Sequence, residues 1–231
     1  MRKARDEKLL EELKGEISQI EDDYWNGEPI AKLLSTFTEV IDKAIKSLWI
    51  KVFGDAREIS LFAIGGYGRG EMFPRSDIDL LILTEDTSHW RRQIEDFIQR
   101  IYNFNFEIGH SVRTIEECVI EMKNDISVET ALMERRQLAG STSVSGLLSR
   151  RLKRESISKD DDYFGLKELE QNNRHKQFQN VDYGLEPNIK NSPGGLRDIH
   201  TILWIALKRH KTISKIELVK LGVLTRTESR L

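Results

Sequence analysis

Apolar residues recur at helical spacing through the first fifty residues of the chain. Residues 3–22 and 29–53 follow this pattern, with polar positions filling the intervals. A spacing of three and four residues puts the apolar side chains on one face of a helix. In the second range that face is formed by Leu33, Phe37, Ile41, Ala44 and Leu48. The pattern predicts N-terminal helices within residues 1–58.

Short, dense apolar runs come next. Residues 59–64 and 77–83 are bounded by Gly, Pro and Ser, which is typical of buried strands. Residues 104–114 alternate between apolar and polar positions, which predicts a third strand, whereas residues 88–102 return to helical spacing. We therefore expect residues 59–139 to form a catalytic core, with a small mixed sheet flanked by helices.

Strand patterns all but vanish in the second half of the chain. Helical spacing dominates in 115–139, 141–155, 160–180 and 195–210. We expect an α+β protein in which a helical subdomain, residues 140–231, follows the core. The last residues, "ELVKLGVLTRTESRL", stop in mid-pattern, and we expect the chain to be a fragment of a longer protein.

Composition and charge restrict the classes of function. The 231 residues hold 36 basic and 38 acidic side chains, so there is no excess of positive charge for nonspecific nucleic-acid binding. The single cysteine, Cys118, excludes an intrachain disulfide and a cysteine-rich zinc site. No apolar run approaches the length of a membrane span, and the N-terminus is too charged for a signal peptide. We expect a cytoplasmic protein with no membrane and no nucleic acid among its partners.

Two aspartates begin the second predicted strand. Residues two apart in a strand project to the same face, so Asp77 and Asp79 point together while Ile78 and Leu80 point to the opposite side. Neighbouring carboxylates repel each other, which raises a pKa or demands a cation. Mg²⁺ suits one or two carboxylates together with substrate phosphates. The pattern predicts catalytic, metal-binding roles for Asp77 and Asp79.

Glycines supply the other half of this site. Gly65 and Gly66 directly follow the first strand, so backbone N–H groups face an anion with no side chain between. A short helix is expected next, and its first turn would favour a phosphate. Other glycine motifs fail, because Glu71 and Phe73 stand where a dinucleotide fingerprint needs glycine and no P-loop is present. The combination indicates a site for a metal–nucleoside triphosphate; the alternative is a structural loop that the aspartates cap.

A third carboxylate, Glu107, lies in the third predicted strand. Sites with two metal ions usually need another carboxylate besides the first pair. We expect Glu107 to be catalytic and metal-binding, and the alternative is an edge-strand glutamate in solvent.

The stretch "GGYGRGEMFPRSDIDLLIL" resembles the nucleotidyltransferase motif of the DNA polymerase β superfamily. More narrowly, it resembles the bacterial PII-protein uridylyltransferases. Three further stretches agree: "EIGHSVRTIEEC" (107–118), "ETALMERRQLAG" (129–140) and "LEPNIKNSPGGLRDIHTILWIA" (185–206). Where that family commonly shows Leu-Trp-Asp, this chain has Ile101-Tyr102-Asn103, which leaves Glu107 as the better third ligand.

The resemblance implies a polymerase β-like fold and transfer of UMP from UTP to a tyrosine of the PII signalling protein, with release of pyrophosphate and Mg²⁺ as cofactor. Longer family members continue into a His-Asp metal domain that removes UMP and into glutamine-sensing domains; the printed sequence has no His-Asp dipeptide. The residues expected to bind nucleotide are Gly65, Gly66, Arg69, Ser76, Lys190 and Arg197.

Several alternatives stay open at this stage. Another polymerase β-like enzyme would modify RNA or a small molecule, and an idle regulatory domain would bind nucleotide without turnover. The loop 185–198 either folds towards the cleft, with Lys190 or Arg197 near phosphate or partner, or caps the helix that follows it. His200, four residues before Trp204 on a predicted helix, is expected to pack in the core or on the helix face and not to be catalytic. Cys118 is expected to be buried and inert.

Overall fold

The computed structural model describes residues 2–104, 106–155, 160–179 and 188–230. The chain forms two compact units. The first, here the sheet unit, comprises residues 1–124 and 134–155, and the second, the helical unit, comprises residues 125–133 and 156–231. Residues 140–155 thus group with the sheet, whereas the expected ranges put them with the later helices.

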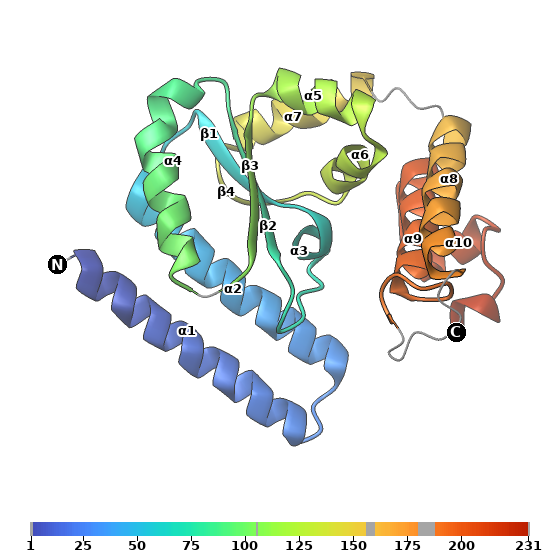
Figure 1. The fold of residues 1–231 in the computed structure, drawn as a ribbon, viewed down its shortest axis with the longest axis horizontal. Helices are drawn as coiled ribbons and strands as arrows, with labels where there is room; N and C mark the ends of the chain where they lie inside the picture. The colour runs from blue at the N-terminus through green and yellow to red at the C-terminus, as the bar shows by residue number, and fades with distance from the viewer. Residues whose placement is uncertain (1, 105, 156–159, 180–187, 231) are drawn as a thin grey trace. The chain divides into compact units, whose positions relative to one another are not determined.

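A four-stranded mixed sheet forms the centre of the sheet unit (Figure 1). Its strands are β1 (Ile59–Ala63), β2 (Ile78–Thr84), β3 (Ile108–Arg113) and β4 (Arg136–Gly140), in the order β3-β2-β1-β4. β1 pairs antiparallel with β2 and β4, while β2 and β3 are parallel. The parallel pair needs a crossover connection, which α4 (Thr87–Tyr102) provides. The expected α+β fold with a small mixed sheet is confirmed.

One face of the sheet packs against α2 (Ile30–Phe53) and α4, and α1 (Arg2–Trp25) packs against α2 and adds to the same core. The alternate residues Ile78, Leu80 and Ile82 of β2 belong to this core. On α2, the Trp49 ring lies 4.1 Å from the Phe53 ring, centroid to centroid. Side chains on the strand alternate, so Asp79 faces the other side of the sheet.

The other side of the sheet is covered by α5 (Ile115–Asn124) and α7 (Thr142–Glu155), which lie side by side (Figure 1). Cys118 of α5 and Leu148 of α7 are both fully buried. Burial raises the pKa of the Cys118 thiol to about 11, so the thiol is uncharged at neutral pH. The expectation that Cys118 is buried is confirmed.

Two sequence-based predictions of elements are wrong in part. The predicted helix 115–139 is α5, then α6 (Ile126–Met133), and then strand β4. β4 forms because its backbone pairs with the open edge of β1, a tertiary contact that the sequence "RQLAG" does not announce. The predicted strand 104–114 starts only at Ile108, because the turn after α4 extends to Phe104, whose N–H donates to the Ile101 carbonyl at 2.9 Å.

The helical unit contains α6, α8 (Asp160–Gln179), α9 (Leu196–His210), α10 (Lys215–Lys220) and the 3₁₀ helix η1 (Glu228–Arg230). Buried charges join its helices. Lys208 of α9 donates to Glu129 of α6 at 2.5 Å, and both side chains are buried. Lys167 of α8 lies 4.5 Å from the Trp204 ring centroid. In the described part of the chain, the helices are too short or too polar to cross a membrane.

Candidate functional site

Asp79 lies at the end of the sheet where β1 turns into α3 (Gly65–Arg69). Its carbonyl accepts a hydrogen bond of 3.0 Å from the backbone N–H of Ile64, the last residue before α3. On its other side, Asp79 pairs in register with Gly109 of β3. The backbone of Asp79 is therefore held by both neighbouring strands beside the two-glycine turn.

Two glycines make room for the Asp79 carboxylate. A Cβ atom on Gly109 would lie 2.3 Å from Oδ1, and one on Gly65 would lie 3.2 Å from Oδ2. Gly65 also has a φ of +59°, a conformation that favours glycine. Gly65 is predicted from the sequence to let phosphate approach the backbone. The structure shows that it also leaves space for the carboxylate of Asp79, a predicted metal ligand; we call this space, formed by Gly65 and Gly109, the glycine cradle.

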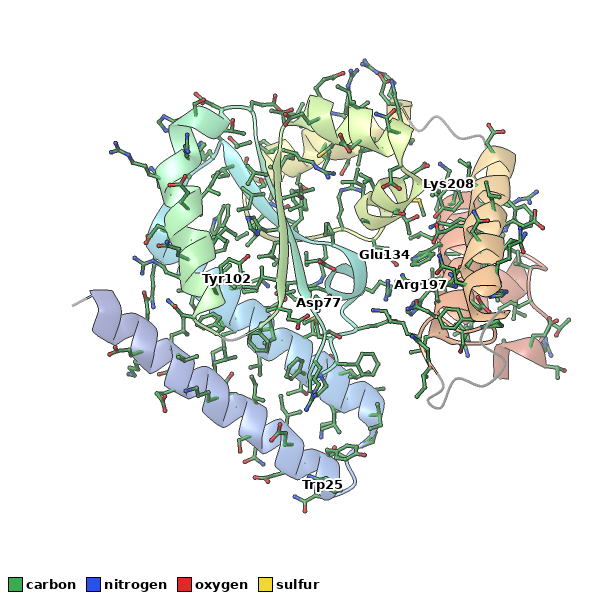
Figure 2. The ribbon with its side chains drawn as sticks, viewed as in Figure 1. Trp25, Asp77, Tyr102, Glu134, Arg197 and Lys208 are labelled. Carbon is green, nitrogen blue, oxygen red and sulfur yellow. The ribbon has the colours of Figure 1, made fainter. Side chains whose placement is uncertain are left out.

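Asp77 stands immediately before β2 and is exposed to solvent (Figure 2). The turn that precedes it is closed by Ser76, whose hydroxyl accepts a hydrogen bond of 3.1 Å from the Phe73 N–H. Because residues two apart share a face, Asp77 lies on the same side of the sheet as Asp79. The structure brings these two predicted metal ligands and Ser76 to one end of the sheet.

The backbone of Glu107 contacts Ile78, the residue between Asp77 and Asp79. Its carbonyl accepts a 2.8 Å hydrogen bond from the Ile78 N–H, just before β3 begins, and its side chain is exposed. Within the described ranges, no group of three His, Cys, Asp or Glu side chains is arranged to hold a metal ion. The role of Glu107 as a third ligand stays a prediction.

Arg69, at the end of α3, is bound by two carboxylates. Its Nε donates to Glu71 at 2.7 Å and its Nη1 donates to Glu134 at 2.8 Å. A Cβ atom on Gly66 would lie 3.7 Å from Nη2, so the guanidinium lies beside the two-glycine turn. Burial opposes the charge, but Glu134 and Glu71 outweigh burial and raise the pKa of Arg69.

A polar network from α2 and β4 holds the same turn in place. Tyr67 of α3 donates its hydroxyl to Asp42 of α2 at 2.8 Å. Arg136 of β4 donates to Asp42 at 3.1 Å and to the Tyr67 carbonyl, also at 3.1 Å. Desolvation raises the pKa of the Tyr67 hydroxyl well above its usual value, so it remains a protonated donor.

Sequence reasoning missed Asp42, Glu71, Glu134 and Arg136 as supports of the site. Glu134 lies between α6 and β4 (Figure 2). A Cβ atom on Gly68 would lie 2.5 Å from the Glu134 carbonyl oxygen, so α3 packs closely on this segment. The available signal is the charged run "ERRQ" within "ETALMERRQLAG", a segment for which the sequence pattern predicts a helix.

Lys190 and Arg197 belong to the helical unit and are described there alone. Lys190 is exposed, and its carbonyl accepts a 2.9 Å hydrogen bond from the Arg197 N–H. The guanidinium of Arg197 lies 5.5 Å from the Trp204 ring centroid. Their expected roles in binding nucleotide stay predictions.

The described part of the loop before α9, residues 188–195, is a compact turn. A Cβ atom on Gly195 would lie 2.6 Å from the Ile189 carbonyl oxygen, so only glycine fits there. Asp198 accepts from the Gly194 N–H at 2.8 Å and pairs with His175 of α8 at 2.9 Å. This geometry supports the loop as a cap of α9, whereas residues 185–187 lie outside the described residues. His200 lies on α9 with its ring centroid 5.8 Å from that of Trp204, which agrees with the expected packing role of His200.

A pocket of about 730 Å³ lies near the opposite end of β1. It is lined by the end of α2, the following loop and the start of α7, with Lys46, Arg57 and Ser143 among its residues. None of the predicted site residues lines it, so it is separate from the aspartate site.

Two protein-family models match different parts of the chain. The nucleotidyltransferase domain model matches residues 39–138, and the GlnD PII-uridylyltransferase model matches residues 163–231. A solved structure described as "Crystal structure of the toxin-antitoxin with AMP-PNP" covers 59% of this chain and 97% of its own, with a TM-score of 0.32 and 14% identity.

Curated relatives align along most of the chain. Bifunctional uridylyltransferase/uridylyl-removing enzymes are 37% identical over 209 residues in Pseudomonas putida, 36% over 234 residues in Vibrio campbellii and 42% over 193 residues in Hydrogenovibrio crunogenus. These alignments cover 89%, 98% and 83% of this chain but 23%, 27% and 22% of the relatives. The chain therefore spans about a quarter of the length of these relatives. With a nucleotidyltransferase domain followed by a uridylyltransferase segment, the chain belongs to the PII-uridylyltransferase family.

Proposed function

We propose that this chain transfers UMP from UTP to a tyrosine of the PII signalling protein and releases pyrophosphate. The observation that carries the proposal is the cradle around Asp79, formed by Gly65 and Gly109, beside a two-glycine turn. Asp77 lies on the same side of the sheet, and the names of the relatives supply the nucleotide class. The PII protein and UTP are the partners that this proposal requires.

The donor set at the end of the sheet fits Mg²⁺. Asp77 and Asp79 provide hard carboxylate oxygens, and Mg²⁺ is commonly held by one or two carboxylates together with substrate phosphates and water. When bound, Mg²⁺ would neutralise the triphosphate and lower the pKa of the attacking hydroxyl. We propose Asp77 and Asp79 as its ligands, with Glu107 as a third carboxylate.

The other residues act on the position of the nucleotide. Gly65 and Gly66 lack side chains, so phosphate oxygens can approach the backbone of the turn closely. Arg69 lies beside Gly66, where its charge attracts the triphosphate. Ser76 closes the turn before Asp77 and thereby fixes the backbone position from which the Asp77 carboxylate extends. We keep Lys190 and Arg197 as proposed contacts to phosphate or to PII.

Transfer from labelled nucleotides tests the proposal. The chain is incubated with PII and with UTP, CTP, ATP or GTP labelled at the α-phosphate, and label on PII is located by peptide mapping. We expect label from UTP on a tyrosine, and none with Asp77→Asn. Label on RNA or a small molecule instead of PII would support another polymerase β-like reaction. Nucleotide binding without pyrophosphate release would identify an idle domain.

A further inference from the structure

The two carboxylates that hold Arg69 differ greatly in exposure. The side chain of Glu134 is 4% exposed, whereas that of Glu71 is 43% exposed. Arg69 itself is largely buried, at 15%. One guanidinium is therefore shared between an interior partner and a surface partner.

These two contacts differ in strength for a physical reason. An exposed ion pair exchanges readily with water and other ions, so it contributes little. Removing one partner of a buried pair leaves an uncompensated charge in a place that water does not reach, which is costly. The Arg69–Glu134 pair is thus the durable contact and the Arg69–Glu71 pair the one that can be exchanged.

Both Arg69 and Glu71 are attached to the two-glycine turn. The backbone N–H of Glu71 donates to the Gly66 carbonyl at 3.1 Å, and Nη2 of Arg69 lies beside Gly66. A triphosphate on this turn would bring negative charge to the guanidinium and next to the Glu71 carboxylate. The negative charges of the phosphate and of the Glu71 carboxylate would repel each other, while the Arg69 guanidinium would pair well with phosphate oxygens.

We propose that Glu71 is a displaceable counter-ion, which pairs with Arg69 in the nucleotide-free protein and gives way to a phosphate of the incoming nucleoside triphosphate. Glu134 is the positioning residue that keeps the guanidinium beside the turn during this exchange. The inference rests on the proposed function in one respect, that the ligand is a nucleoside triphosphate with its metal. It adds a pair of acidic residues with opposite effects on nucleotide affinity.

Direct binding of Mg²⁺–UTP, measured by calorimetry, tests this without any transfer step. Glu71→Gln and Glu134→Gln make the same change, because glutamine keeps the size of the side chain and removes its charge. We expect Glu71→Gln to lower the Kd about 2- to 5-fold, the range of an exposed ion pair. We expect Glu134→Gln to raise the Kd by about tenfold or more, since Arg69 loses its buried partner.

A control separates local exchange from net charge. Glu121→Gln changes the charge equally at an exposed position of α5, outside the turn, and should leave the Kd unchanged. A Glu71→Gln variant that binds no tighter than this control overturns the displaceable counter-ion. A Glu134→Gln variant that binds like the wild type overturns its positioning role.

The remaining outcomes also decide. If thermal unfolding shows that Glu134→Gln does not fold, the comparison of Glu71→Gln with Glu121→Gln decides alone. Absence of nucleotide binding in the wild type and in Glu71→Gln overturns both the counter-ion and the proposed function. The expected order of affinities without transfer to PII supports the counter-ion and contradicts the proposed function only.

Discussion

Gly65 and Gly109 are 44 positions apart in the sequence, yet both leave space for the carboxylate of Asp79. The first glycine turns the chain out of β1, and the second removes a side chain from the neighbouring strand β3. At the scale of single residues, the site is therefore defined as much by absent side chains as by acidic ones. The glycine of β3 is the more sensitive of the two, because its Cβ atom would lie only 2.3 Å from Oδ1.

Gly109→Ala should displace the Asp79 carboxylate. A contact of 2.3 Å is impossible, and a shift of about 1 Å in a catalytic group can lower a rate about 100-fold. The measurement is the rate of UMP transfer together with the free energy of unfolding in urea. Gly15→Ala is the matched control, because nothing lies within 4 Å of its Cβ position in α1. That control should add about 0.5–1 kcal/mol of stability and leave the rate unchanged. Equal rates in the two variants would show that the cradle is not needed.

Glu107→Gln addresses the third carboxylate. If Glu107 acts mainly in the transition state, the substitution should lower kcat about 100-fold or more with little change in the Kd of UTP. Steady-state kinetics and calorimetry separate the two effects. A change in affinity with kcat intact would remove Glu107 from the catalytic set.

At the scale of elements, the short helix α3 is fixed by contacts from α2 and β4. Asp42 of α2 joins Tyr67 and Arg136 in one buried network. Thr38 of α2 adds a hydrogen bond of 3.0 Å to the Gly70 carbonyl, at the end of α3. An isolated helix of five residues is unstable in water, so these contacts give the turn its defined position.

This network makes stability depend on pH in a defined direction. Burial disfavours the charge of Asp42, but hydrogen bonds from Arg136 and Tyr67 outweigh it and lower the pKa of the carboxyl below its usual value. A lowered pKa means stability that is present above the unfolded-state pKa and is lost as pH falls through the folded-state pKa. Asp42→Asn should therefore cost about 2–4 kcal/mol at pH 7, where the charged pair is broken.

Urea unfolding at a series of pH values measures this contribution. The difference between the wild type and Asp42→Asn should shrink as the pH falls below about 4, the usual range of an aspartate. A difference that stays constant down to pH 2 would mean that the Asp42 charge does not contribute.

At the scale of the whole molecule, the order of helices and strands could largely be predicted, because hydrophobic periodicity is a local signal. Asp77, Asp79 and the two-glycine turn could also be predicted, since their spacing in the sequence puts them at one end of two adjacent strands. β4 was not, because "RQLAG" becomes a strand only by pairing with β1. Glu134 escaped for the same reason, as its contact with Arg69 joins residues 65 positions apart.

The division into units likewise depends on contacts between distant segments. α6 belongs to the helical unit through the Glu129–Lys208 pair, although the chain on either side of it belongs to the sheet unit. A buried pair of this kind gives no periodic signal, because each residue alone reads as a surface charge. The sequence pattern therefore favoured a single boundary near Gly140, while the contacts assign α7 to the sheet unit.

The most direct test of the proposed metal site is the rate of UMP transfer from UTP to PII by Asp79→Asn compared with the wild type, at saturating Mg²⁺. Asparagine keeps the shape of the side chain in its glycine cradle and removes the charge that the metal requires. We expect the wild type to modify a tyrosine of PII, and the variant to be slower by about 1,000-fold or more with an unchanged unfolding midpoint. A folded Asp79→Asn variant that transfers UMP at nearly the wild-type rate would contradict the proposed metal site.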